Sequence, residues 1–295
     1  MVIIQTLSYQ EYSATYVFKE ANTFMLMDID YDPQQGRVTQ AGAYRHFLPP
    51  SPLNYWVQSF WQLNVPSGQF SYRGVPDNCV DWIINLNNVE DNIIVPPFLS
   101  PIEFTLAGQV SYFGIRFRVL GHQSLISVPL GEWCLNNGVA HAMDLLSNTL
   151  LHTAFERLER AQSFDERCKC LSTLLLSVVK RTTVDMRVAH YIRYCHRNTT
   201  SCINLSDQQC SEFGVSSRQL RRLTQLYLGA TPKDFARVLR FQGTLNTMDV
   251  DKKNVAWAAH YYDQSHYIRE FKRLSGFTPT EFKNLSVLSN QRANG

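Results

Sequence analysis

Two segments near the C-terminal end of the chain carry side chains that can recognise nucleic acid. Arginine can form paired hydrogen bonds with the edge of guanine, and glutamine can do so with adenine. Lysine and arginine also neutralise phosphates. A charged helix face is more often simply solvated, but the arginines of the first segment have no acidic residue near them in sequence. The available side chains are Arg218, Arg221, Arg222 and Gln225 in the first segment, and Gln264, His266, Arg269, Lys272 and Arg273 in the second.

The histidines and cysteines form no pattern for a metal or a cofactor. His46, His122, His141 and His152 are scattered without an H-x-H pair, whereas a metal-dependent enzyme needs clustered ligands. The 7 cysteines include a C-x-C pair at 168 and 170, which is not a zinc spacing. We therefore expect no metal, no cofactor and no enzymatic activity, and we expect structural thiols rather than disulfides.

The two basic segments belong to an internal repeat with an offset of 47 residues. SSRQLRRLTQLYLGATPKDF (216–235) recurs as DQSHYIREFKRLSGFTPTEF (263–282). The first residue of each copy, Ser or Asp, can cap the start of a helix. Gly229 and Gly276 can end that helix in the left-handed conformation, and a Thr-Pro pair then starts the next one. Each copy therefore predicts a helix, a sharp stop and a new helix.

A shorter helix is expected before the first of these repeats. Capping-box patterns begin at Ser206 and at Ser216, and Gly214 provides the turn between them. This order of helix, short turn and helix predicts a helix-turn-helix unit. An amphipathic helix over 184–195 precedes it, and a long helix over 232–248 joins it to the second unit.

Residues 183–285 resemble the DNA-binding domain of the AraC/XylS family of transcription regulators. The most specific stretch is YYDQSHYIREFKRLSGFTPTEF, in which D-Q-S-H, R-x-F-K-R, the glycine and T-P match the family pattern. The chain departs from that pattern at His260, where the family usually has glycine, and at Thr224, where it usually has an aromatic residue. The resemblance implies two helix-turn-helix units that enter adjacent major-groove segments on one face of the DNA.

By position, the resemblance also implies the role of individual side chains. Its partners would be double-stranded promoter DNA and RNA polymerase, with the chain as an activator. It assigns base contacts to Arg218, Arg221, Arg222, Gln264, Ser265, His266 and Arg269. We expect phosphate contacts from Gln225, Lys272 and Arg273.

An alternative within the same family is a methyl-acceptor repair regulator. Such proteins use a P-C-H-R motif, which resembles Tyr194-Cys195-His196-Arg197. Tyrosine replaces the proline here, and Cys195 falls on the apolar face of an expected helix, where a thiol is inert packing. The paired-cysteine zinc site of those proteins is also missing, so we disfavour this alternative.

The N-terminal part, residues 1–138, reads as β-structure. The segments 79–87 and 111–119 alternate apolar residues on one face, and turn residues separate such runs, which suggests a sandwich or a barrel. VPDNCVDWIINL (75–86) and FGIRFRVLG (113–121) resemble a cupin-like domain of some of these regulators, which binds a small effector or mediates dimerisation. Aromatic residues could line a pocket or, as we favour, fill the core: Trp56, Trp61, Trp82, Phe104, Tyr112 and Phe117.

Residues 139–182 change to a helical period. Phe164, Cys168, Leu171, Leu175 and Val178 form a stripe with 4-3-4-3 spacing. Either two helices pack on the barrel of their own chain, or the stripe pairs with a second copy as a short coiled coil. On the second interpretation we predict a homodimer held by Phe164, Leu171, Leu175 and Val178.

Charge and composition complete the expected organisation. Residues 183–295 hold 16 Lys and Arg against 9 Asp and Glu, whereas residues 1–182 hold 12 against 16. Only the C-terminal part is therefore expected to meet a polyanion. No apolar run suits a membrane span or a secretory signal, so we expect a bacterial cytoplasmic protein. The expected fold is α+β and multidomain, with a cupin-like β-barrel domain (1–138), a helical dimerisation segment (139–182) and an all-α double helix-turn-helix domain (183–295).

Overall fold

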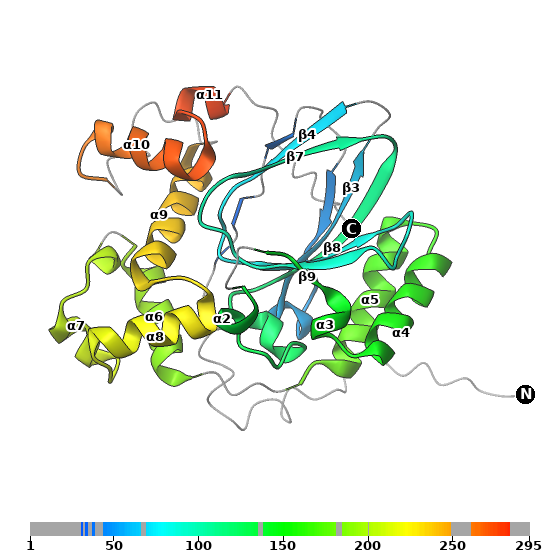
Figure 1. The fold of residues 1–295 in the computed structure, drawn as a ribbon, viewed down its shortest axis with the longest axis horizontal. Coiled ribbons are helices and arrows are strands. Elements are labelled where there is room, and N and C mark those ends of the chain that lie inside the picture. The colour runs from blue at the N-terminus through cyan, green and yellow to red at the C-terminus, as the bar shows by residue number, and fades with distance from the viewer. Residues whose placement is uncertain are drawn as a thin grey trace, which may run out of the picture.

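The computed structural model describes residues 31, 33–34, 37–38, 44–65, 69–134, 138–180, 185–199, 201–248 and 261–283. Within them, a β-rich N-terminal domain lies beside a group of helices from the C-terminal part of the chain (Figure 1). No helix of this described part is long and apolar enough to cross a membrane.

Two antiparallel sheets make up the N-terminal domain. The larger sheet has the strand order β2-β3-β8-β5-β6-β9 and the smaller one β1-β4-β7. The expected β-rich fold class is confirmed, but the described strands form two separate sheets and no closed barrel. The strands are β1 (Arg37–Val38), β2 (Tyr44–Phe47), β3 (Val57–Val65), β4 (Gln69–Gly74), β5 (Val80–Asn85), β6 (Asn92–Val95), β7 (Ile102–Ala107), β8 (Val110–Phe117) and β9 (Ala140–His141).

The larger sheet separates two apolar layers. On one face Trp82 and Phe117 are fully buried in the main core. On the other face Trp61 and Tyr112 cluster with Tyr72 of the smaller sheet. The alternation predicted for β5 and β8 is observed because successive side chains of a strand point to opposite faces.

Helices α4 (Asn148–Arg160) and α5 (Phe164–Val178) pack on the first of these faces (Figure 1). Phe164, Leu171 and Leu175 are at most 3% exposed and belong to the same core as the sheet, with Val178 packed against it. Their stripe therefore packs on the sheet of its own chain. The prediction that it forms a dimer interface is wrong, because no apolar face of it is left for a partner.

The C-terminal part of the chain is helical, as expected. The second helix-turn-helix turn, with His260, lies outside the described residues. The remaining helices are α2 (Leu130–Trp133), α3 (Ala142–Leu145), α6 (Met186–Arg197), α7 (Asp207–Glu212), α8 (Ser217–Leu228), α9 (Pro232–Met248), α10 (Gln264–Ser275) and α11 (Pro279–Lys283), with short 3-10 turns at Leu53–Tyr55 (η2), Gly121–Ser124 (η3) and Ser201–Ile203 (η4).

Helix α9 belongs to two hydrophobic cores. Its first half packs Phe235 and Leu239 with Tyr191 of α6. Its second half packs Phe241 with Phe271 of α10, whose ring centroids are 5.2 Å apart. One continuous helix thus positions α8 at one end and α10 at the other (Figure 1).

Candidate DNA-binding surface

Helices α8 and α10 begin and end as the repeat predicts. Ser206 and Ser216 each form a capping box, and the Asp263 carboxylate accepts a hydrogen bond from the His266 amide at 2.7 Å. Gly229 and Gly276 end the two helices with φ of 65° and 79°, a conformation that glycine adopts without steric cost. These contacts are local in sequence, which is why the sequence predicted them.

Each of the two helices buries one face and exposes the other. In α8, Leu220 and Leu223 are buried, and in α10, Tyr267 and Phe271 are buried. The predicted contact residues lie on the opposite faces and are exposed, apart from His266, which is half-buried. The exposed ones are Arg218, Arg221, Arg222, Gln225, Gln264, Ser265, Arg269, Lys272 and Arg273.

Two residues singled out in the sequence, one predicted contact and one departure from the family pattern, have their side chains engaged within the chain. The His266 ring packs edge-on against Tyr261, with centroids 5.6 Å apart, so it is less free to reach a base than its neighbours. The Thr224 hydroxyl is buried and donates to the Arg221 carbonyl at 3.1 Å. A small polar side chain thus fits at this buried position.

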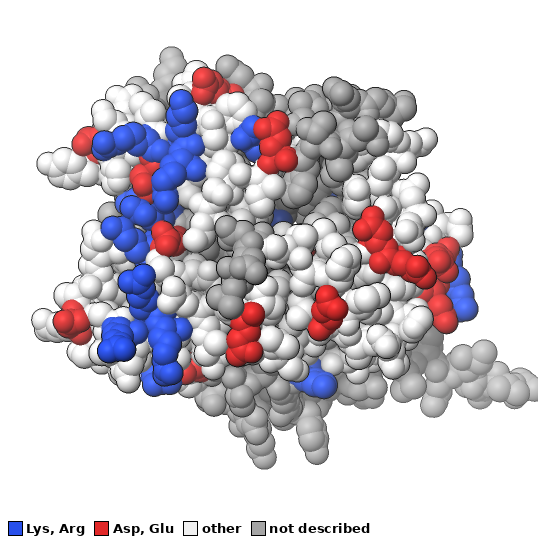
Figure 2. Space-filling model, viewed as in Figure 1, with Lys and Arg blue, Asp and Glu red and all other residues white. Residues whose placement is uncertain are grey.

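The exposed basic side chains gather on one side of the molecule. Figure 2 shows Lys and Arg in a strip that runs over α10, α9 and α8. Arg218, Arg221 and Arg222 form no ion pair with any other residue in the described part of the chain. Their charges are therefore available to a polyanion.

Glu270 is a site residue that the sequence analysis missed. Its carboxylate lies 3.5 Å from guanidinium nitrogens of Arg237 and Arg240 on α9 and of Arg273 on α10. The Arg240 guanidinium also lies over the Tyr261 ring, 4.3 Å from its centroid. The available signal was an acidic residue between the apolar positions of an otherwise basic helix.

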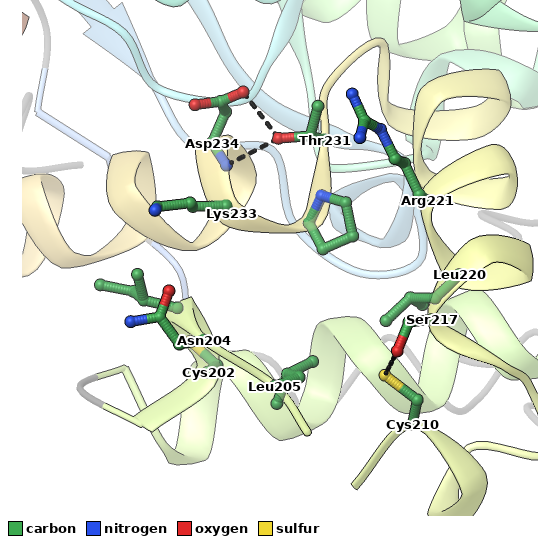
Figure 3. A pocket seen from close by; sticks show the side chains of 12 residues that line it. Cys202, Asn204, Leu205, Cys210, Ser217, Leu220, Arg221, Thr231, Lys233 and Asp234 are labelled. Atoms are coloured by element: carbon green, nitrogen blue, oxygen red, sulfur yellow. Dashed lines mark hydrogen bonds between the residues drawn. The ribbon is translucent and has the colours of Figure 1, made fainter. Parts of the chain in front are cut away.

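A groove of about 550 Å³ opens beside the first unit (Figure 3). In this view Cys202, Leu205 and Cys210 lie along its lower side, and Asp234 of α9 and Arg221 of α8 lie apart along its upper side. The Asp234 carboxylate accepts a hydrogen bond from Thr231 at 2.6 Å. With both charge signs in its lining, the groove is poorly suited to a lone anion.

The N-terminal domain contacts two helices of this surface, α9 and α8. The loop 75–79 docks on α9, where the Asn78 side chain donates to the Phe235 carbonyl at 3.2 Å, and the Gln242 side chain donates to the Pro76 carbonyl at 2.7 Å. Helix α2 packs on α8 so closely that a Cβ atom on Gly131 would lie 2.4 Å from a backbone oxygen of α8.

A third contact reaches the end of α10. The Arg73 guanidinium lies over the Phe277 ring, 4.5 Å from its centroid. Together with the contacts at α2 and at the loop 75–79, it ties the N-terminal domain to both basic helices.

The docking loop is held by a buried charge cluster. The Arg116 guanidinium pairs with Asp77 at 2.9 Å and with Asp81 at 2.8 Å, and the Trp61 indole donates to Asp81 at 3.0 Å. One cation thus serves two carboxylates. Burial raises the pKa of Asp77 to about 6, against the Arg116 charge, which lowers it.

The residues considered for other chemistry do not form a reactive site. Cys195 is fully buried on α6, and burial raises the pKa of its thiol well above the ordinary value, so it is not placed to accept a methyl group. All seven cysteines are free thiols. The described residues contain no group of three or more potential metal ligands.

Residues 209–284, which contain α8 and α10, match the family described as helix-turn-helix domain. The C-terminal part of this chain therefore contains a helix-turn-helix domain. This match supports a DNA-binding regulator of transcription. Residues 45–137 match a domain of unknown function, DUF6597. No catalytic family matches the chain.

Three solved structures show a distant likeness to this chain. Unsaturated-fatty-acid-bound wild-type ToxT from Vibrio cholerae strain SCE256 is 9% identical, with 89% of this chain and 99% of that chain covered and a TM-score of 0.37. ToxT from Vibrio cholerae O395 is 12% identical (84% and 96% covered, TM-score 0.37), and the AraC-like transcriptional activator CuxR is 13% identical (71% and 88% covered, TM-score 0.24). Such values support no residue correspondence. No curated protein matches the sequence significantly.

Proposed function

We propose that the protein activates transcription by placing α8 and α10 in adjacent major-groove segments of promoter DNA, together with RNA polymerase. The observation that carries this proposal is the pair of capped helices with exposed basic faces on one side of the molecule, joined by the single helix α9. A protein with such a surface binds DNA through phosphate contacts and reads it through base contacts.

The proposed roles follow the exposure of each side chain. Arg218, Arg221 and Arg222 on α8 contact base edges, as do Gln264, Ser265 and Arg269 on α10. His266 contributes least, because its ring packs on Tyr261. Gln225, Lys272 and Arg273 contact phosphates.

Selection from a random duplex library with the full-length protein tests this function. We expect enrichment of one sequence with two recognition segments, bound far more tightly than competitor DNA and more weakly as salt rises. Equal binding to selected and scrambled duplexes at every salt concentration would contradict it. Transcription from a promoter carrying the selected site then tests activation against repression.

We further propose that the N-terminal domain responds to a small-molecule effector beside its larger sheet. The Tyr44 hydroxyl is buried, at 5% exposure for the residue, without a hydrogen-bond partner in the described part, and it lies in the layer of Trp61 and Tyr72. An aromatic layer with an unused polar group suits a small ligand. A thermal-shift screen tests this: a ligand whose shift is lost in Tyr44→Phe supports the site, and a ligand unaffected by the change binds elsewhere.

Homodimerisation and the domain division stay predictions. We propose domains at 1–138, 139–182 and 183–295, a cytoplasmic location and a homodimer with no interface assigned. Light scattering of the full-length protein tests the oligomeric state, and a mass equal to one chain at all concentrations would refute the dimer.

A further inference from the structure

Helix α10 exposes one apolar side chain on its otherwise polar outer face. Ile268 is 36% exposed and belongs to none of the hydrophobic clusters, whose α10 members are Tyr267, Phe271 and Leu274. It lies four residues after Gln264 and four before Lys272, so these side chains form one ridge along the helix. Ile268 therefore lies among the predicted DNA contacts and outside the core.

The internal repeat shows that this position differs between the two units. The repeat aligns Ile268 with Arg221 and Ser265 with Arg218, whereas Arg269 aligns with Arg222. At these three aligned positions α8 carries three guanidinium groups, whereas α10 carries one, at Arg269, next to an isoleucine. Two helices with such different side chains cannot favour the same bases.

In the major groove, an apolar side chain has one matching partner. Thymine alone among the four bases carries a C5-methyl group there, and apolar contact with it distinguishes thymine. The charge of Arg269 and Lys272 on the same face suits DNA as the occupant of this surface better than an apolar partner protein.

We propose that Ile268 contacts the C5-methyl group of a thymine and so selects thymine in the DNA segment under α10. This inference rests on the proposed function, because it requires α10 to lie in the major groove. The DNA site is then asymmetric: guanine dominates the segment under the three arginines of α8, and the segment under α10 contains a required thymine.

Replacing thymine by deoxyuridine isolates this contact, because uracil lacks only the methyl group. Each thymine of the library-selected duplex is replaced singly, and affinity is measured for the full-length wild type and for Ile268→Ala. We expect one thymine whose replacement weakens wild-type binding about fourfold, the factor that burial of one methyl group provides. The same replacement should leave the affinity of Ile268→Ala unchanged.

Met143→Ala is the matched control, because Met143 is an exposed apolar residue, 64% exposed, on α3 of the N-terminal domain. It should keep the full sensitivity to deoxyuridine. The inference is overturned by a selected site without thymine under α10, by a wild type insensitive to every replacement, or by equal sensitivity in Ile268→Ala. Failure to select any sequence would instead overturn the proposed function, and this inference with it.

Discussion

At the scale of single residues, Glu270 is the carboxylate that connects α10 to the joining helix α9. Glu270 and Arg240 are both buried, and Arg237 and Arg273 complete the cluster. The arrangement also holds Arg273 near α9, which limits how far that side chain can reach toward phosphate.

Replacing Glu270 by glutamine should destabilise the fold, because the buried Arg240 then lacks its counter-charge. Breaking such a pair costs about 3 kcal/mol. Urea unfolding of Glu270→Gln measures this loss of unfolding free energy. Glu159→Gln, at an exposed position of α4, should change stability little, and equal stability of the two variants would show that the cluster adds nothing.

Arg222 should act in sequence recognition. It is exposed on α8 two residues after the buried Leu220, so its guanidinium can bond O6 and N7 of one guanine. Arg222→Ala should lose about 1–3 kcal/mol of binding free energy and relax preference at one base pair. A site library measures this preference, and an unchanged preference would refute the reading role.

Lys272 should act on the DNA backbone. It lies in the last turn of α10, away from the helix start. Lys272→Ala should weaken binding to all sequences alike and reduce the log–log salt slope by about one unit. Affinities at several salt concentrations measure the slope, and a changed base preference would contradict a phosphate role.

At the scale of elements, local signals were predictable and non-local ones were not. Caps at Ser216 and Asp263 and the stops at Gly229 and Gly276 depend on residues within a few positions of one another, so the sequence reveals them. The α5 stripe has the same spacing whether it packs on its own sheet or on a second copy. Only the structure could decide between these, and only the structure shows the contacts from Glu270 to α9.

The contact between α2 and α8 depends on the absence of a side chain at Gly131. An added Cβ would lie 2.4 Å from the Gln225 carbonyl oxygen, so Gly131→Ala should push α2 away and cost about 1–3 kcal/mol of stability. Thermal unfolding measures the cost. Gly138→Ala is the control, because an added Cβ there meets nothing within 4 Å. Equal melting temperatures of the two variants would mean that the contact between α2 and α8 adjusts without a cost in stability.

At the scale of the whole molecule, the two domains meet through a loop whose charge depends on pH. Folding raises the pKa of Asp77 to about 6 from 3.8, chiefly through burial. The folded chain therefore binds this proton more tightly than the unfolded chain, and the stability that this provides is lost as pH rises through about 6.

Asp77→Asn should remove this dependence. Relative to the variant, the wild type should gain about 1 kcal/mol of unfolding free energy between pH 7.5 and pH 5. Burial lowers the pKa values of His122 and His196 to about 4. These two groups therefore reduce the unfolding free energy as pH falls over the same range, but they do so equally in both proteins. Denaturant unfolding at several pH values gives the difference, and parallel curves would contradict the prediction.

Because α9 is one continuous helix, it limits which insertions and substitutions the chain can accept. Each residue of a helix adds about 1.5 Å of length and about 100° of rotation. A single insertion near its middle would therefore turn α10 out of phase with α8 and break one of the two cores that α9 shares. Substitutions on the outer faces of α8 and α10 can change which bases are recognised. The interval between the two recognised DNA segments stays the same, because the length of α9 sets it.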